Sequence, residues 1–150
     1  MNRAELVKEW LEAYKKEDAE LDELLERIRE LRSSIGPKAQ ELTFELKSHN
    51  SNGDLMGDYV IRLEAMEGDA SKRLADHRRN RDAILDLIGR YKRREEQDVI
   101  KMRYLYRMEW GEILKRIYGK LEDYKLNQDK YSRRMYRAHN RMLDWMGKHW

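Results

Sequence analysis

The segment from Tyr131 to Trp145, YSRRMYRAHNRMLDW, combines four arginines and an asparagine with aromatic, methionine and leucine side chains. A guanidinium group can bind phosphate or donate two parallel hydrogen bonds to guanine, and an asparagine amide can form two hydrogen bonds with adenine. Asp144 is the single carboxylate of the segment. These residue types indicate a surface that binds a polyanion, DNA above all.

A helix through this segment separates the two kinds of side chain, because successive residues are turned by about 100°. We expect the helix to begin at Ser132, a residue type that favours the N-cap. Its apolar arc holds Met135, Tyr136, Ala138, His139, Met142, Leu143, Trp145 and Met146, and its opposite arc holds Arg133, Arg134, Arg137, Asn140, Arg141, Asp144 and Lys148. The apolar arc would dock on preceding helices, with His139 as a packing or hydrogen-bonding residue. The basic arc would fit the major groove of B-DNA. The alternatives are an ordinary solvated helix face and a helix lying on an anionic membrane.

The composition predicts an all-α chain. Of the 150 residues, 41% are charged and 40% hydrophobic, with 8 Gly and 1 Pro, which is typical of long helices with charged outer faces. The absence of Cys excludes a disulfide framework and a thiolate metal site. We find no Gly-rich phosphate loop, no H-E-x-x-H pair and no ligand spacing among the 4 histidines. We therefore expect neither an enzyme nor a metal or cofactor site.

The chain contains no apolar run near the roughly 20 residues that cross a bilayer. We expect a soluble, cytoplasmic protein without a membrane partner. Its charge is unevenly distributed: residues 1–88 carry 15 Lys and Arg against 20 Asp and Glu, whereas residues 89–150 carry 17 against 9. Net charges of −5 and +8 indicate that the second part meets a polyanion, with uneven helix solvation as the alternative.

Two long amphipathic patterns fill the first part of the chain. The first runs from about Arg3 to Ser34 and should stop at Gly36–Lys38, where Gly precedes Pro. The second runs from about Asp58 to Tyr91, after a polar loop over Lys47–Gly57. We predict that residues 1–92 form an acidic, coiled-coil-like antiparallel hairpin, serving as a stalk or as the surface of a homodimer or higher homo-oligomer. Their apolar positions are Trp10, Tyr14, Leu21, Leu24, Ile28, Leu31 and Ile35, and then Tyr59, Leu63, Met66, Ala70, Leu74, His77, Ile84, Ile88 and Tyr91.

Shorter helical units follow in residues 93–150, which we predict to form a basic helix-turn-helix domain of three helices. The first places Val99, Met102, Leu105 and Tyr106 on one face, and the second places Trp110, Ile113, Leu114 and Ile117. Mixed polar residues then lead to the helix from Ser132. Arg133, Arg134 and Arg137 would contact bases or phosphates, and Arg141, Lys120, Lys125 and Lys148 would hold phosphates.

The segment MRYLYRMEWGEI (Met102–Ile113) resembles a phrase of small phage regulators that reads roughly R-Y, two or three residues, then G-x-[ST]-W-x-E-I. The segment MYRAHNRML (Met135–Leu143) resembles their later element VYRLH. The family is that of the RinA/ArpU-type phage transcriptional regulators, whose C-terminal part is similar to region four of sigma factors. The resemblance covers about Glu95 to Trp145, a third of the chain.

The resemblance implies a helix-turn-helix activator of late phage genes that acts on double-stranded DNA beside host RNA polymerase. Trp110, Glu112 and Ile113 would belong to the positioning helix. Ser132, Arg133, Arg134 and Arg137 would open the recognition helix, and Tyr136 and His139 match the Tyr and His of the family phrase.

The sequence departs from the family pattern in three places. Arg107–Trp110 reads RMEW where the family has G-x-[ST]-W, and Leu114 replaces a small residue. Ser132 also lies much farther beyond Trp110 than in the family, so residues 120–130 are an insertion that would lengthen the positioning helix or form a wing. A small-terminase-like DNA-packaging protein and a non-catalytic coiled-coil adaptor remain as alternative functions.

Overall fold

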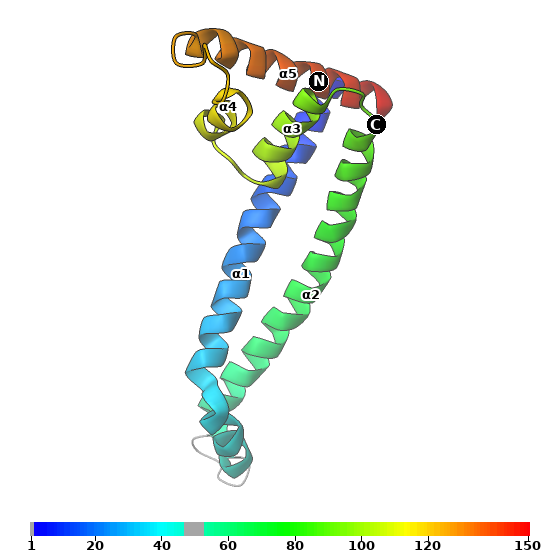
Figure 1. The fold of residues 1–150 in the computed structure, drawn as a ribbon. Coiled ribbons are helices and arrows are strands. Elements are labelled where there is room, and N and C mark those ends of the chain that lie inside the picture. Colours follow the sequence, from blue (N-terminus) through cyan, green and yellow to red (C-terminus); the bar gives the residue numbers. More distant parts are fainter. Residues whose placement is uncertain (1, 47–52) are drawn as a thin grey trace. The chain divides into compact units, whose positions relative to one another are not determined.

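The computed structural model describes the backbone of residues 2–46 and 53–150 and the side chains of residues 2–35 and 57–150. In these ranges the chain is all-α, as predicted. Two long antiparallel helices, α1 (Arg3–Leu46) and α2 (Gly53–Gly89), precede the shorter α3 (Arg94–Ile100), the π-helical turn η1 (Lys101–Leu105), α4 (Trp110–Tyr118) and α5 (Gln128–His149) (Figure 1). No helix in these ranges combines the length and the apolar character that crossing a lipid bilayer requires.

The chain divides into two compact units. One comprises Asp18–His77, and the other comprises Met1–Glu17 together with Arg78–Trp150. The first turns of α1 and the last turns of α2 therefore belong to the same compact unit as α3, η1, α4 and α5. The predicted division into an N-terminal hairpin over residues 1–92 and a DNA-binding domain over residues 93–150 stays a prediction.

The unit Asp18–His77 is a pair of antiparallel helices held by polar contacts along its length. Arg32 Nε donates to Glu67 Oε1 at 2.7 Å, Arg73 lies 3.4 Å from Glu20, and His77 Nε2 lies 2.7 Å from Asp18 Oδ1. Residue numbers rise along α1 as they fall along α2, which defines the antiparallel register. Leu21, Ile28, Ala70 and His77 are buried between the helices.

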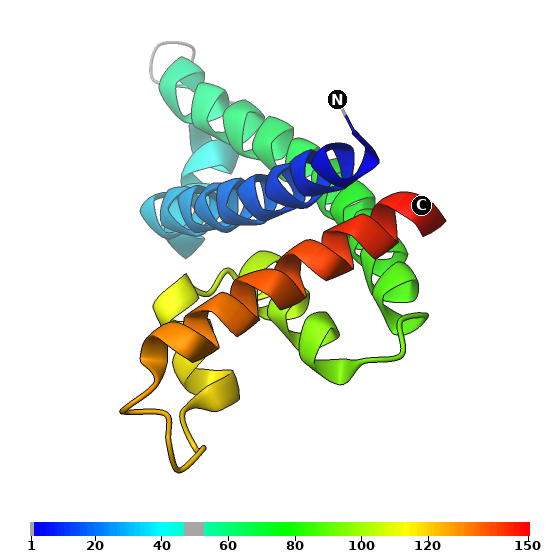
Figure 2. The same ribbon diagram turned by 90° about the horizontal axis from the view of Figure 1, so that it is seen from above.

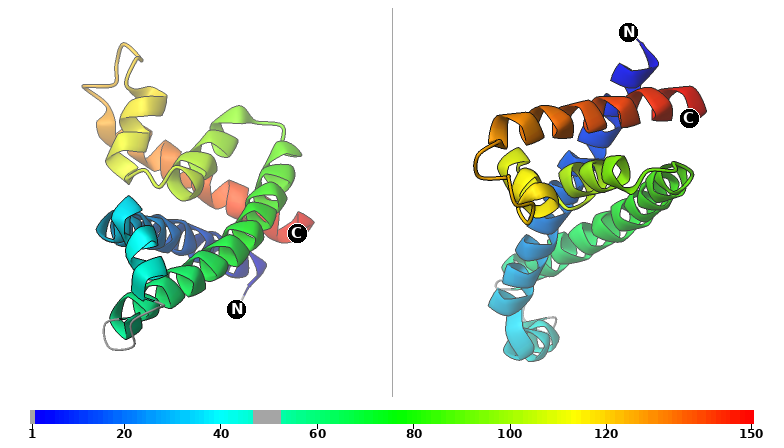
Figure 3. Two further views of the ribbon diagram at one scale, coloured as in Figure 1. Left: turned by 90° about the horizontal axis from the view of Figure 1, so that it is seen from below. Right: turned by 45° about the horizontal axis from the view of Figure 1, so that its top comes forward.

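The other unit packs around two apolar clusters. The first joins the start of α1 and the end of α2 to the end of α3, to η1 and to the last turns of α5. Its residues are Val7, Leu11, Tyr14, Ile84, Leu87, Ile88, Ile100, Tyr104, Leu105, Met142, Leu143 and Met146. The second joins α3 and α4 to the first half of α5, through Val99, Ile113, Tyr118, Tyr131, Met135 and Ala138. Figure 2 shows α5 running from α4 to the first turns of α1, and Figure 3 shows α4 beside the start of α5.

Helix ends were the weakest part of the sequence prediction. The predicted end at Gly36–Lys38 is wrong, because α1 continues to Leu46; an internal proline removes one hydrogen bond and kinks a long helix without having to end it. Gly53–Gly57 of the predicted loop belong to α2, and residues 47–52 lie outside the described residues.

The predicted N-cap at Ser132 is also wrong. Helix α5 begins at Gln128 after Asn127, so Ser132 lies in its second turn. The added turn is stabilised by Tyr131, whose ring is buried with its centroid 5.3 Å from that of Tyr118. Residues 119–127 form a series of turns, so the insertion neither lengthens α4 nor forms a wing.

The predicted burial of Tyr106 is wrong for a different reason. The amide of Tyr106 donates to Lys101 O, five residues earlier, so the helix widens into a π turn. The wider turn changes the angle between residues, so Tyr104 points inward with no exposed surface and Tyr106 stays 60% exposed.

Candidate nucleic-acid interface

Helix α5 buries one face along its whole length. Its buried residues are Tyr131, Met135, Ala138, His139, Met142, Leu143, Met146 and Gly147, which recur at threes and fours. The packing of this face against two apolar clusters determines the direction in which the opposite face points.

His139 connects α5 to the helices beneath it. Its Nε2 lies 2.7 Å from the Tyr104 hydroxyl, and its ring meets the Trp110 ring edge-on at 5.0 Å. Arg103 completes the group, with its guanidinium 4.6 Å from the centre of the Trp110 ring. Burial disfavours the imidazolium and lowers the pKa of His139, although Asn140 opposes this effect. His139 is therefore a neutral packing residue rather than a group that contacts solvent.

The other predicted core residues lie at the interface between α4 and α5, except Met142, which belongs to the apolar cluster formed with α1, α2 and η1. Ile113, Met135 and Met142 are fully buried, and Trp110 and Ile117 are half-buried. Tyr136 lies at the rim, 42% exposed, with its ring 5.1 Å from Trp110. The prediction that Tyr136 belongs to the buried face is wrong, because its position on the helix falls at the edge of the apolar arc.

The outer face of α5 carries a row of polar side chains at 3-4-3 spacing: Lys130, Arg133, Arg137 and Asn140. Together with Tyr136 they line a shallow depression of about 480 Å³. Arg133 Nε donates to Asp129 O at 3.3 Å and Arg137 Nε to Arg133 O at 3.4 Å, both backbone carbonyls of the same helix. Among the described side chains, no carboxylate forms an ion pair with Arg133 or Arg137. We name these four residues the outer row.

Arg134 differs from its neighbours, since Glu95 of α3 holds it by two hydrogen bonds. Nε and one terminal nitrogen lie 2.9 and 3.0 Å from the two Glu95 oxygens, and the guanidinium also lies 5.6 Å from the centre of the Tyr118 ring. The Tyr118 hydroxyl donates to Glu95 as well. Burial alone would raise the pKa of Glu95, but the hydrogen bonds from Arg134 and Tyr118 outweigh burial and lower this pKa. Arg134 is thus engaged within the fold.

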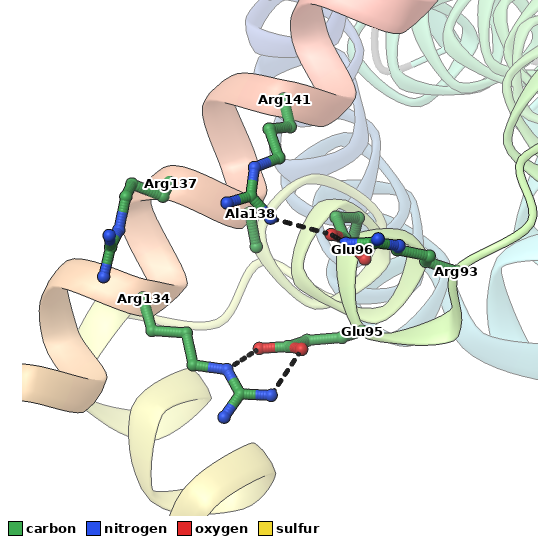
Figure 4. Close-up of a pocket in the computed structure, with 7 residues that line it drawn as sticks. All are labelled: Arg93, Glu95, Glu96, Arg134, Arg137, Ala138 and Arg141. Carbon is green, nitrogen blue, oxygen red and sulfur yellow. Dashed lines mark hydrogen bonds and ion pairs between the residues drawn. The ribbon is translucent and has the colours of Figure 1, made fainter.

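Arg141 lies on the same flank of α5 as Arg134. One of its terminal nitrogens is 3.6 Å from Glu96 Oε1, and a terminal nitrogen of Arg93 is 3.8 Å from the same oxygen. Figure 4 shows these residues around a cleft of about 260 Å³, with Arg137 at its outer edge.

The remaining predicted DNA contacts are spread more widely. Lys120 and Lys125 are exposed in the turns before α5, and Ser132 is half-buried. The turns are held by Asp123, whose Oδ1 accepts from Tyr131 at 2.5 Å and whose carbonyl accepts from Asn127. Lys148 is exposed in the last turn of α5, about 27 Å along the helix from Lys130 at 1.5 Å per residue. The structure therefore brings together the outer row but not Lys148.

The sequence prediction missed Lys130, Arg93, Glu95, Glu96 and Tyr118. Lys130 had a signal, because it continues the 3-4-3 row once α5 is started at Gln128. The other residues had none, since their roles depend on contacts between α3 and α5.

Among the described side chains, no group of three His, Asp or Glu residues is arranged to hold a metal ion. Comparisons of the chain with protein-family models, with characterised proteins and with solved structures found no match.

Proposed function

We propose that this protein is a sequence-specific regulator that binds double-stranded DNA with α5 as its recognition helix. The observation that carries the proposal is the outer row, which lies opposite the buried face of α5; none of the described carboxylates pairs with Arg133 or Arg137. From Lys130 to Asn140 the row extends about 15 Å, and a helix of about 10–12 Å diameter fits the major groove of B-DNA.

The chemistry of the outer row suits base recognition. Arg133 and Arg137 can each donate two hydrogen bonds to guanine, and the side-chain amide of Asn140 can form two hydrogen bonds with adenine. Lys130 in the first turn of α5 and the exposed Lys120 and Lys125 in the preceding turns could contact phosphates, which would orient the helix. The net charge of +8 over residues 89–150 favours the encounter with DNA.

The turn before α4 supports the resemblance to phage late-gene regulators with a helix-turn-helix. Arg107 has a φ of 53°, in the left-handed region that favours glycine, and it stands where the family phrase has Gly. Glu109 is the N-cap residue of α4 and stands where the phrase has Ser or Thr. Activation of late genes beside RNA polymerase is part of this proposal, as is self-association through the N-terminal helices.

The proposal is tested by selecting bound fragments from random duplex DNA and sequencing them. We expect enrichment of a short motif that contains G and A, matching two arginines and one asparagine. Binding without a motif, by a ring-shaped oligomer, would favour the DNA-packaging alternative. The absence of any DNA binding would refute the proposal and favour the adaptor.

Substitution within α5 tests the recognition helix directly. Arg133→Ala and Arg137→Ala should each weaken binding to the selected site by about 1–3 kcal/mol and relax the preference at one base pair. Arg134→Ala is the matched control on the same helix, because Glu95 engages Arg134. This substitution should lower the free energy of unfolding by about 1 kcal/mol and change the affinity for DNA by less. Fluorescence anisotropy with matched and mutated duplexes measures both effects. Equal losses of affinity for Arg134→Ala and Arg137→Ala would contradict this assignment.

A further inference from the structure

The cleft between α3 and α5 is lined by four guanidinium groups and two carboxylates: Arg93, Arg134, Arg137, Arg141, Glu95 and Glu96. Both carboxylate oxygens of Glu95 already accept hydrogen bonds, from Arg134 and from Tyr118. The remaining groups are three arginines and one carboxylate, which leaves an excess of positive charge. Figure 4 shows Arg141 and Arg93 approaching Glu96 from different segments of the chain.

Glu96 holds two arginines close together without using their hydrogen-bond donors. Its side chain is only 3% exposed, while those of Arg93 and Arg141 are 70% and 55% exposed. The two nitrogen–oxygen distances, 3.8 and 3.6 Å, exceed the roughly 2.7–2.9 Å of a charge-assisted hydrogen bond. A buried carboxylate thus offsets the mutual repulsion of two guanidinium groups that donate no hydrogen bond to any described residue.

We infer that this cleft is a phosphate-binding site, in which Arg93 and Arg141 donate to the oxygens of one phosphate group. A phosphate offers several acceptor oxygens, and guanidinium groups match their geometry in pairs. Glu96 is a positioning residue: it keeps Arg93, in the segment before α3, and Arg141, on α5, at the same end of the cleft.

The phosphate comes from the DNA backbone if the proposed function holds, and this part of the inference rests on it. Arg137 lines both the cleft and the depression of the outer row. A strand that borders the groove occupied by α5 would therefore pass the cleft. The other source with the same chemistry is a free phosphate or a nucleotide.

The first experiment compares Arg93→Gln/Arg141→Gln with Arg81→Gln/Arg90→Gln, which removes the same charge from exposed positions on and just after α2 in the same compact unit. Affinity for the selected duplex is measured over a range of salt concentrations. We expect the cleft variant to lose about tenfold in affinity and to reduce the salt slope by about 1, as for one lost phosphate contact. The control variant should change affinity by much less. Thermal unfolding verifies that both variants fold.

The second experiment needs no DNA. Inorganic phosphate is titrated into the wild-type protein at constant ionic strength, and the arginine Nε–Hε signals are followed by NMR. Shifts of the Arg93 and Arg141 signals that saturate, and that chloride does not reproduce, would establish free phosphate as a ligand. A DNA effect without such shifts would assign the cleft to the DNA backbone.

Failure of the inference and failure of the proposed function give different results. If the wild-type protein selects a DNA motif, but the cleft and control variants bind alike and phosphate causes no specific shift, the inference is refuted and the proposed function stands. If the protein binds no DNA but the phosphate shifts appear, the proposed function is refuted and the cleft is a site for free phosphate.

Discussion

At the scale of single residues, the four arginines of α5 differ in the groups that face them. Arg134 and Arg141 point to the side of α3, where Glu95 and Glu96 lie, whereas Arg133 and Arg137 point away from both carboxylates. Four arginines within nine positions of one helix therefore face two different environments. This division makes Arg133 and Arg137 the better candidates for base recognition.

The buried imidazole of His139 predicts an acid-sensitive stability. Burial lowers its pKa in the folded protein, while the unfolded chain has the ordinary value near 6.5. The unfolded state therefore takes up the proton first, so the contribution of His139 to the free energy of unfolding is complete above about pH 7 and is lost as the pH falls below 6.5.

Urea unfolding at several pH values between 5 and 8 measures this effect. The non-titrating variant His139→Gln should lose less of its free energy of unfolding than the wild-type protein over the same range, even if it is about 1 kcal/mol less stable at pH 7 through lost packing. Parallel pH profiles for the two proteins would show that His139 does not cause the acid sensitivity.

At the scale of elements, the short path from α3 to α4 determines how α4 meets α5. The π turn at Lys101–Leu105 directs Tyr104 to His139, and the chain then reverses at Arg107 before α4 begins at Trp110. Arg107 is the only non-glycine residue with a positive φ among the described residues. Such a conformation costs on the order of 1 kcal/mol for a residue with a side chain.

Two substitutions at Arg107 separate backbone conformation from side-chain contacts. Arg107→Gly and Arg107→Val both remove the arginine side chain, but a β-branched residue fits a φ of 53° poorly. We expect the Gly variant to be more stable than the Val variant by about 1–2 kcal/mol in chemical denaturation. Equal stability of the two variants would mean that the turn does not require the left-handed conformation.

At the scale of the whole molecule, the two ends of the chain belong to one compact unit. The first turns of α1 pack on the end of α5, where Trp10 stacks on Trp150 with ring centroids 5.3 Å apart. At Gly147 a Cβ atom would lie 3.0 Å from Ala4 N and from Arg3 C. The absence of a side chain at Gly147 therefore permits the close approach of the two helices.

Adding one methyl group tests this contact between the ends. Gly147→Ala should destabilise the protein by about 1–3 kcal/mol, because the α1 backbone must move away from α5. Gly111→Ala is the matched control: its Cβ would meet no atom of the described residues within 4 Å, so the higher helix propensity of Ala should stabilise α4 by up to about 1 kcal/mol. Thermal unfolding compares them, and hydrogen exchange in the first turns of α1 should increase only for Gly147→Ala. Similar effects of the two substitutions would contradict the close approach.

The sequence by itself determined those features of the fold that depend on local periodicity. The spacing of apolar residues at threes and fours predicts the all-α class, the two long helices and the buried face of α5, because this period reflects the geometry of a single helix. Helix ends were less predictable, since Pro37 and Ser132 carry signals that neighbouring turns and the packing of Tyr131 outweigh.

What only the tertiary structure decided is which polar groups meet. Glu95 and Arg134 are 39 positions apart, and Gly147 meets Arg3 and Ala4 at the other end of the chain. Neither contact can be predicted from residue spacing, because contacts between elements depend on how several apolar faces are buried together. Three features follow from that packing: the division of the α5 arginines between the α3 side and the outer face, the cleft at Glu96, and the membership of the first turns of α1 in the C-terminal unit.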